Sequence, residues 1–198
     1  MIDRNIIVAV TGASGVVYAQ RLLQILNQKQ INIHLVISES AIDVIEHELG
    51  IKLDRNNINA RKLLGTEPHN VSIYDPCDVN SPIISGGFKT MEMVIVPCSM
   101  NSLCSIANGI ASNIIYRAAS VTLKEGRKLV FVPRETPVTQ IHLENMLKLA
   151  NAQACILPAM PGFYHNPKTI DDQIDFVVAK ILDYLSIEHE INIRYEHI

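Results

Sequence analysis

Short apolar runs alternate along the chain with longer segments whose apolar residues recur every three or four positions. The short runs are rich in β-branched residues and polar at their margins, which is typical of parallel strands buried on both faces. Five segments have this character: Ile6–Val10, Ile31–Ile37, Met93–Pro97, Lys128–Pro133 and Ala154–Pro158. The pattern therefore predicts a parallel sheet.

The segments between these runs have the apolar spacing of amphipathic helices. We predict helices at Val16–Lys29, Glu39–Leu49, Ser102–Gly126 with a break near Asn113, Thr139–Asn151 and Thr169–Leu185. Thr169 is a suitable N-cap for the last helix, because Asp171 and Asp172 follow it in the first turn. The order of the elements indicates a single-domain, doubly wound α/β fold of the Rossmann or flavodoxin-like kind, mostly parallel, with helices on both faces.

One segment fits this alternation poorly. Residues Asn56 to Gly87 are rich in Asn, Pro, Ser and Gly, and we interpret them as a long excursion before the third strand. We see no internal repeat or linker elsewhere. The 198 residues therefore suit one α/β domain at residues 1–186, followed by a short charged tail at residues 187–198.

Composition excludes several classes of function. Seventeen Lys and Arg against twenty Asp and Glu give a formal charge of -3, so we expect no nucleic acid partner. The apolar runs are shorter than the ~20 residues of a membrane span, and the first residues lack the features of a signal peptide. The four cysteines show no CxxC spacing and the seven histidines no paired metal spacing. These features favour a soluble, cytoplasmic protein without a metal.

Ligands of doubly wound sheets bind outside the carboxyl ends of the strands, so the loops there are candidate sites. In the first loop, TGASG at Thr11–Gly15, small residues allow backbone N–H groups at a helix start to face an anion such as a phosphate. A tight strand-to-helix turn is an equally good reading. Tyr18 stands where a dinucleotide fingerprint has its third glycine, which favours a mononucleotide over NAD. The hydroxyl of Ser38, after the second strand, would face the same crevice.

The second loop, PCSMNS at Pro97–Ser102, follows a buried strand with a run of small polar side chains. Ser99, Asn101 and Ser102 can hydrogen-bond a ribityl chain, a phosphate or a ring edge, whereas capping of the next helix would explain only one of them. Cys98 has no histidine or lysine nearby in sequence, so we assign it a structural role.

The third and fourth loops carry charged and aromatic residues. Arg134 and Glu135 directly follow the apolar strand LVFVP, so we expect them in the crevice rather than as a surface pair. MPGFYHNP, at Met160–Pro167, is either a packed cover over the sheet end or a lid that carries the phenol of Tyr164. Two histidines lie nearby. We expect His142 to pack or to form a hydrogen bond, and His165 to face solvent.

Six motifs occur in a characteristic order: TGASG, PCSMN, YRAASVTLKE, VPRETP, IHLENM and PGFYHNP. In this the chain resembles UbiX-type flavin prenyltransferases, a branch of the homo-oligomeric flavin-containing decarboxylase-like fold, from about Ile6 to Leu185. The resemblance implies transfer of a dimethylallyl group from dimethylallyl monophosphate to N5 and C6 of reduced FMN, without a metal. The prenylated FMN would serve a UbiD-type decarboxylase, most commonly in ubiquinone synthesis.

The resemblance also implies a homo-oligomer, in this family a dodecamer, whose sites are shared between subunits. Its FMN site would comprise Gly12, Ala13, Ser14, Ser38, Ser99, Met100, Asn101, Ser102 and Arg134. Its dimethylallyl phosphate site would comprise Tyr164, Lys180, Glu48 and Ser85, with Arg117 and Lys124 from a neighbouring subunit. Three residues would take part in the chemistry: Glu135 in proton transfer, Ser14 in holding the phosphate, and Lys124 in stabilising its departure.

Two positions depart from the family pattern, because Lys180 stands where relatives often have Arg, and Gly87 gives SGGF in place of SGSF. Two other functions remain open. An FMN-dependent decarboxylase of cysteine-containing substrates would need a catalytic histidine, for which we find no clear equivalent. A non-catalytic FMN-binding subunit of a decarboxylase would not need the cluster of Arg117, Lys124, Glu135, Tyr164 and Lys180.

Overall fold

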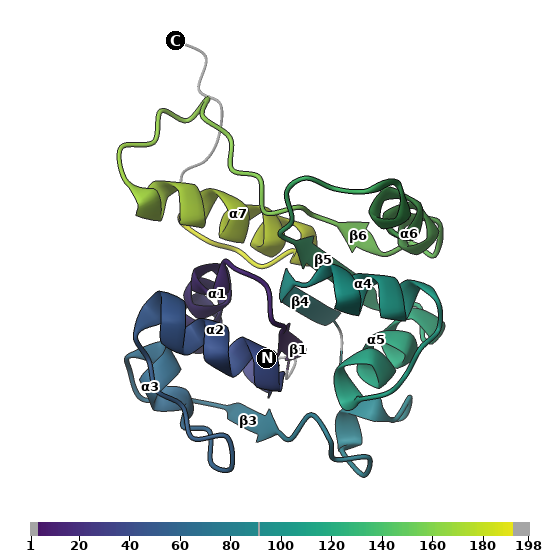
Figure 1. Cartoon of the computed structure of the whole chain (residues 1–198). Helices are drawn as coiled ribbons and strands as arrows, with labels where there is room; N and C mark the ends of the chain where they lie inside the picture. Colours follow the sequence, from purple (N-terminus) through teal and green to yellow (C-terminus); the bar gives the residue numbers. More distant parts are fainter. Residues whose placement is uncertain (1–3, 91, 192–198) are drawn as a thin grey trace.

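The computed structural model describes residues 4–90 and 92–191 and contains a six-stranded parallel sheet (Figure 1). Its strands are β1 (Asn5–Val10), β2 (Asn32–Ile37), β3 (Val71–Tyr74), β4 (Glu92–Cys98), β5 (Lys128–Pro133) and β6 (Cys155–Ile156). They are ordered β3-β2-β1-β4-β5-β6, which is the Rossmann order. The chain therefore reverses direction across the sheet between β1 and β4, and this switch point opens a crevice at their carboxyl ends.

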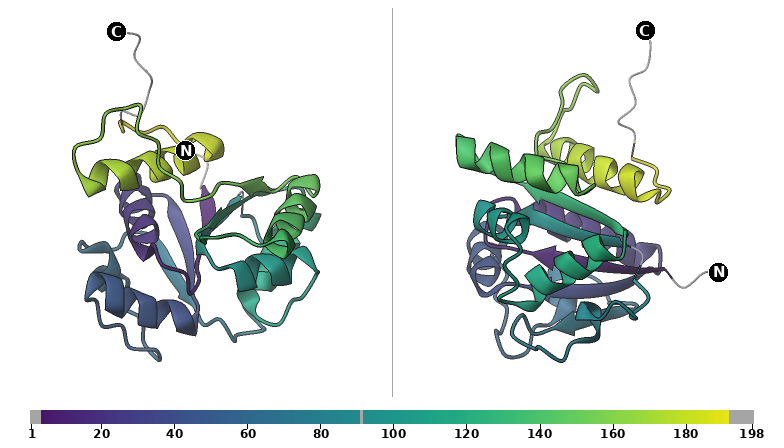
Figure 2. Two further views of the ribbon diagram at one scale, coloured as in Figure 1. Left: turned by 45° about the horizontal axis from the view of Figure 1, so that its top comes forward. Right: turned by 90° about the vertical axis from the view of Figure 1, so that its right-hand side faces the viewer.

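Helices cover both faces of the sheet (Figure 2). The α-helices are α1 (Val16–Gln28), α2 (Glu39–Leu49), α3 (Ala60–Leu64), α4 (Met100–Ala107), α5 (Ile114–Lys124), α6 (Gln140–Asn151) and α7 (Ile170–Leu185), with a 3-10 helix η1 at Pro82–Ile84. Helices α1, α2, α3 and α7 pack on one face, and α4, α5 and α6 pack on the other. The predicted doubly wound class is confirmed.

The two faces explain why the strands read as unbroken apolar runs. In β1, Ile6 and Val8 belong to the core under α1 and α7, whereas Ile7 and Ala9 belong to the core under α4 and α5. Successive side chains therefore enter the two cores in turn, and neither face of the strand meets water.

The interpretation of residues 56–87 as a long excursion before the third strand overlooked two elements of the fold. This segment contains α3, begun by an Asn59 cap and ended by Gly65 in the left-handed conformation, and then β3. Strand β3 pairs with β2 at the edge of the sheet, with Val71 opposite Ile33. Because β3 is short and only partly buried, it lacks the apolar character by which the other strands were found.

The predicted helix at residues 102–126 is divided as expected. Helix α4 ends at Ala107, and the side chain of Asn113 then caps α5 by accepting a hydrogen bond from the Tyr116 N–H at 3.0 Å. Of the predicted tail, residues 192–198 lie outside the described residues. Ile187 is buried in the core beside α7. No helix within the described ranges is long and apolar enough to cross a membrane.

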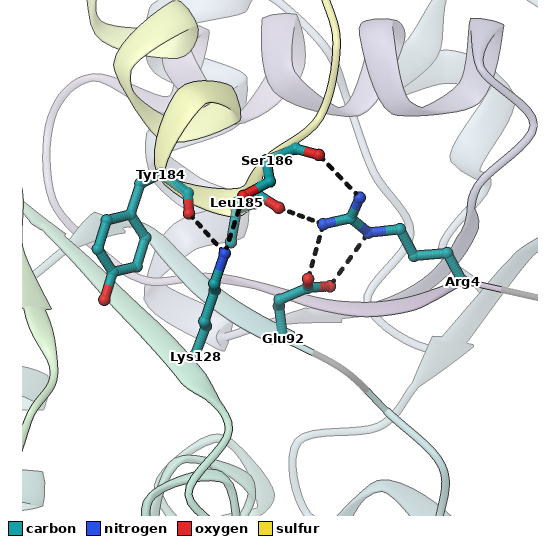
Figure 3. A network of polar contacts seen from close by, with 6 residues as sticks. All are labelled: Arg4, Glu92, Lys128, Tyr184, Leu185 and Ser186. Carbon is teal, nitrogen blue, oxygen red and sulfur yellow. Dashed lines mark hydrogen bonds and ion pairs between the residues drawn. The ribbon is translucent and has the colours of Figure 1, made fainter. Parts of the chain in front are cut away.

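A polar network fastens the end of α7 to the amino ends of the strands (Figure 3). Arg4 forms an ion pair with Glu92 at 2.6 Å and donates to the carbonyl groups of Leu185 and Ser186. Lys128 donates to the carbonyl of Tyr184 and the hydroxyl of Ser186, at 2.9 and 3.1 Å. These cations satisfy the carbonyl groups that the last turn of a helix leaves without partners.

We expect the Arg4→Met substitution to lower the free energy of unfolding by about 3–5 kcal/mol, because it leaves the buried carboxylate of Glu92 uncompensated. Urea titration monitored by circular dichroism measures this loss. The double variant Arg4→Met/Glu92→Leu removes both charges and should recover most of the stability. Equal stability of the Arg4→Met variant and the original chain would contradict the role assigned to the pair.

Candidate active site

A cavity of about 340 Å³ opens at the carboxyl ends of β2 and β4, beside the switch point of the sheet. Its volume lies in the range of about 300–1,000 Å³ that small-molecule sites occupy. The cavity is lined by Ser38, Glu39, Ser40, Pro76, Cys77, Ser99, Asn101, Ser102, Asn113, Ile115 and Tyr116. Four of the residues predicted for an FMN site, Ser38, Ser99, Asn101 and Ser102, are therefore brought together here.

Thr11 joins the loops that follow β1 and β4. Its hydroxyl donates to the carbonyl of Pro97 at 2.9 Å and accepts from the N–H of Ser99 at 2.8 Å. The backbone N–H of Thr11 donates to the same Pro97 carbonyl at 3.3 Å. The hydroxyl is buried, so both of its hydrogen bonds lie away from solvent. The position of Thr11 at the start of TGASG was its only sequence signal, and we did not predict its role.

Gly12 is required because the start of α2 lies against it. A Cβ at this position would lie 2.3 Å from the hydroxyl oxygen of Ser40 and 2.6 Å from its Cβ. The hydroxyl groups of Ser38 and Ser40 are 3.2 Å apart, and Ser38 also caps α2 by accepting from the Ala41 N–H. The predicted pair Gly12 and Ser38 thus share one wall with Ser40, which sequence reasoning missed. Ala13 is buried behind this wall.

Glu48 binds the start of α1. Its carboxylate accepts from the N–H of Gly15 at 2.9 Å and from that of Val16 at 3.2 Å. A carboxylate is favourable at a helix N-terminus, where N–H groups lack partners and the helix dipole is positive. The N–H of Gly15, the last residue of TGASG, and that of Val16 are therefore engaged by a side chain of the protein rather than open to a phosphate.

Arg134 connects the loop after β5 to the loop after β1. Its Nε donates to the carbonyl of Ser14 at 3.2 Å, whereas the carboxylate of Glu135 accepts from the N–H of Thr136 at 3.1 Å. Both side chains are half-buried. Among the residues that the structure describes, no ion pair joins Arg134 to Glu135. The surface salt bridge considered for this motif does not form.

The PCSMNS loop combines capping with a polar wall. Ser99 caps α4 by accepting from the Ser102 N–H at 3.2 Å, and its hydroxyl donates to that of Ser102 at 3.0 Å. The phenol of Tyr116, on α5, is 3.2 Å from the Ser102 hydroxyl and accepts from the Asn101 amide at 3.5 Å. Tyr116 is thus a further wall residue, and its signal was the YRAAS motif.

Two sulfur-containing side chains of this loop point into the core. Met100 is buried under α4, and Cys98 is fully buried at the end of β4. Burial raises the pKa of the Cys98 thiol far above its ordinary range, because the charged thiolate would be desolvated. Cys98 is therefore not an activated nucleophile, as its predicted structural role requires.

Tyr164, Lys180 and Arg117 do not line the cavity of their own chain. The rings of Tyr164 and Phe176 meet edge to face with centroids 5.6 Å apart, and the Lys180 ammonium lies 5.7 Å from the centroid of Phe176. Arg117 is exposed on α5, where its Nε donates to the Ala111 carbonyl at 3.2 Å.

Lys124 and Ser85 lie near the amino ends of the strands, opposite the carboxyl ends where the cavity opens. Helix α5 ends at Lys124, shortly before β5 begins, and the loop with Ser85 precedes β4, so both residues adjoin the amino ends of strands. The Lys124 ammonium pairs with Glu125 at 3.0 Å and would lie 3.2 Å from a Cβ at Gly86. Within one chain, the structure does not bring these two residues to the cavity.

The expectation of hydrogen bonding is confirmed for His142, whereas that of solvent exposure fails for His165. His142 lies in the first turn of α6, where its Nδ1 accepts from the Thr139 N–H at 3.2 Å and completes a capping box. The expectation that His165 faces solvent is wrong, because both of its ring nitrogens are buried and neither has a hydrogen-bond partner.

A Rossmann-type sheet with a polar cavity at its switch point defines a nucleotide- or flavin-binding protein, and the Flavoprotein family model matches residues 2–192. The chain belongs to the flavin prenyltransferase UbiX family. It is 50% identical over 188 residues to flavin prenyltransferase UbiX of Halalkalibacterium halodurans, covering 95% of this chain and 91% of that one. It is 43% identical over 195 residues to the UbiX of Pseudomonas aeruginosa, covering 96% and 93%.

Solved structures agree with this assignment. AnUbiX (PadA1), in complex with FMN and dimethylallyl pyrophosphate, superposes with a TM-score of 0.86 at 36% identity, covering 98% of each chain. A dodecameric FMN-dependent UbiX-like decarboxylase from Escherichia coli O157:H7 gives 0.85 at 40% identity, covering 98% of this chain and all of that one. The peptidyl-cysteine decarboxylase EpiD gives 0.61 at 17% identity, covering 93% and 99%, which shows a shared fold alone.

We expect the Gly12→Ala substitution to weaken FMN binding, because the new methyl group would push Ser40 and the start of α2 out of the cavity wall. The dissociation constant should rise about tenfold or more, in line with the roughly 1–3 kcal/mol cost of overpacking. Titration of FMN fluorescence measures it. Gly87→Ala is the matched control, since the nearest atom to its Cβ would be 3.8 Å away. Unchanged affinity in the Gly12→Ala variant would contradict the assigned wall.

Proposed function

We propose that this chain is a flavin prenyltransferase that joins a dimethylallyl group from dimethylallyl monophosphate to N5 and C6 of reduced FMN. The contact that supports this function most directly is the one from Arg134 to Ser14. It brings the β5 loop, and with it Glu135, to the β1 loop that borders the cavity. The solved relative AnUbiX, which binds FMN and dimethylallyl pyrophosphate, is consistent with this pairing of ligands.

The cavity residues fit FMN. The hydroxyl groups of Ser38, Ser40, Ser99 and Ser102 and the amide of Asn101 can bind the ribityl chain and phosphate, and the absence of a side chain at Gly12 lets Ser40 take its place in the wall. We assign the FMN site to Gly12, Ala13, Ser14, Ser38, Ser99, Met100, Asn101, Ser102 and Arg134. When bound and reduced, FMN supplies the nucleophilic atoms N5 and C6. The protein supplies orientation, which removes much of the entropy of encounter.

Departure of an allylic phosphate requires cations near its oxygens. The described cavity lining contains no Lys or Arg, whereas Arg117, Lys124 and Lys180 lie exposed on other parts of the chain. We infer that a complete donor site forms only where subunits meet, with neighbouring chains bringing these cations, together with Tyr164 and Ser85, to Glu48 and the cavity. The E. coli relative described as dodecameric supports such an assembly, and we propose a homododecamer.

Exposed apolar side chains offer surfaces for these contacts. Ile141, Leu143 and Leu147 on α6 are each more than half exposed, as are Met160 and Phe163 in the loop before α7. Burial of such side chains between copies would provide the hydrophobic stabilisation of an assembly.

Glu135 is the proposed group for proton transfer. After the C–O bond to phosphate breaks and the bond to N5 forms, ring closure adds a proton to the double bond of the N5-linked prenyl group and removes one from C6, and Glu135 would transfer these protons. Ser14 would hold the released phosphate, and Lys124 would stabilise its negative charge.

The decarboxylase alternative has less support, because the cavity lining contains no histidine among the described residues. We propose further that residues 1–186 form the flavin-binding domain, against which Ile187 packs, and that the protein acts in the cytoplasm. Its product would be passed to a UbiD-type decarboxylase, in ubiquinone synthesis or a related pathway.

Incubation of the chain with reduced FMN and dimethylallyl monophosphate should increase the flavin mass by one C5 prenyl unit. In the Glu135→Gln variant we expect ring closure to slow by about 10²–10⁴-fold while FMN remains bound. Mass spectrometry of the released flavin and absorbance of the bound flavin follow the two quantities. Unchanged FMN mass with both ligands bound would contradict the transferase function, and a wild-type rate in Glu135→Gln would remove its acid–base role.

Lys180 provides a second test. Lys180→Ala should raise the KM for dimethylallyl monophosphate about ten- to hundredfold, the equivalent of about 1.5–3 kcal/mol for a hydrogen bond to a charged group. Lys180→Arg, which restores the residue common in relatives, should retain donor affinity because the guanidinium keeps the charge. Steady-state kinetics at saturating reduced FMN measures both variants, and an unaltered KM in Lys180→Ala would exclude Lys180 from the donor site.

A further inference from the structure

Phe176 lies on the buried side of α7. Residues of the loop at 160–168 pack against its ring. The ring of His165 stacks on it, with centroids 5.1 Å apart and an angle of 22° between the planes. The ring of Tyr164 meets it edge to face at 5.6 Å and 76°. We call these three side chains, Tyr164, His165 and Phe176, the aromatic platform.

Gly162 brings the backbone of the loop directly onto this platform. A Cβ at Gly162 would lie 3.0 Å from the Cζ atom of Phe176 and 3.1 Å from the Cε1 atom of Tyr164. The loop is also fixed where it enters α7, because the Asp172 carboxylate accepts from the N–H groups of Lys168 and Thr169, at 2.7 and 2.9 Å. Its path is thus set at two points.

Lys180 approaches the same ring from the helix. It lies four residues after Phe176, so both side chains are on one face of α7. Its ammonium is 5.7 Å from the ring centroid, within the distance of a cation–π contact. One aromatic ring therefore contacts both the lysine and the tyrosine that we assign to the donor phosphate.

Hydrogen bonds contribute little to the position of His165. Its two ring nitrogens and the Oε1 atom of Gln173, one turn before Phe176, are buried without partners in the described structure. Unpaired buried polar atoms disfavour this arrangement. Ring contacts therefore position His165: the stack on Phe176 and an edge-to-face contact with Tyr164, with centroids 5.9 Å apart.

We propose that Phe176, with His165 stacked on it, is a positioning residue of the prenyl transfer: it holds Tyr164 and Lys180 as one unit that binds the donor phosphate. This inference rests on the proposed function, which assigns the phosphate to these two residues. Phe176 does not contact the reacting atoms. It acts by fixing the distance and angle between a phenol and an ammonium that come from different elements.

The test compares Phe176→Leu, His165→Ala and His165→Phe, with reduced FMN and dimethylallyl monophosphate as ligands. Phe176→Leu keeps an apolar side chain but removes the aromatic face, and His165→Ala removes the stacked ring. Each should raise the KM for the donor roughly tenfold, with kcat and FMN affinity nearly unchanged. His165→Phe keeps the stacked ring without the unpaired nitrogens, so it should retain the original KM.

Lys180→Ala and Tyr164→Phe are measured beside them to separate two kinds of failure. If these two raise the KM while Phe176→Leu and His165→Ala do not, the platform is overturned and the proposed function stands. A lower melting temperature with an unchanged KM has the same meaning, since it indicates packing alone. If His165→Phe is as impaired as His165→Ala, stacking is not the contact that matters. If none of the variants raises the KM, the donor site itself is wrongly assigned.

Discussion

The candidate site depends on the backbone of one short loop, residues 11–16, between β1 and α1. Thr11 ties it to the β4 loop, Gly12 admits Ser40 from α2, and the Ser14 carbonyl receives Arg134 from the β5 loop. Glu48 binds its last two N–H groups. Elements from both halves of the sheet thus meet at the switch point through fixed hydrogen bonds and one close contact. These contacts preorganise the candidate cavity within a single chain.

Much of the fold could be predicted because the central strands are buried on both faces, which makes them continuous apolar runs. The same physical reason explains the failure at β3. An edge strand needs only one partner, and Ser72 and Tyr74 are tolerated because they remain partly exposed. Helix α3 is only five residues long and gives no periodic signal. Helix termini were located well where a side-chain cap marks them, as at Asn113 and Thr169.

The location of the site could be predicted, because the topology of the sheet determines which loops lie together. The carboxyl-end rule brings the loops after β1, β2, β4 and β5 together, and the segments after β2 and β4 contain the four predicted residues that line the cavity, Ser38, Ser99, Asn101 and Ser102. Thr11, Ser40 and Tyr116 were missed because their roles depend on contacts with partners on other elements. Thr11 and Tyr116 lie in motifs that the sequence does show, but a motif does not reveal which side chains it will contact. For Lys124 and Ser85 the prediction and the single chain differ. The resemblance assigns them to the site, whereas within one chain they lie near the amino ends of the strands, away from the cavity.

The fastening of α7 at its carboxyl end has a consequence for local unfolding. Arg4 and Lys128 hold the last turn, and loss of that turn would leave both cations without the carbonyl groups of Tyr184, Leu185 and Ser186 as acceptors. Fraying at this end of the helix therefore breaks contacts to the residues at the start of β1 and β5, so the last backbone amides of α7 should exchange with solvent more slowly than those of an unanchored helix end. Because Phe176 and Lys180 lie on this helix, their spacing persists as long as the domain remains folded.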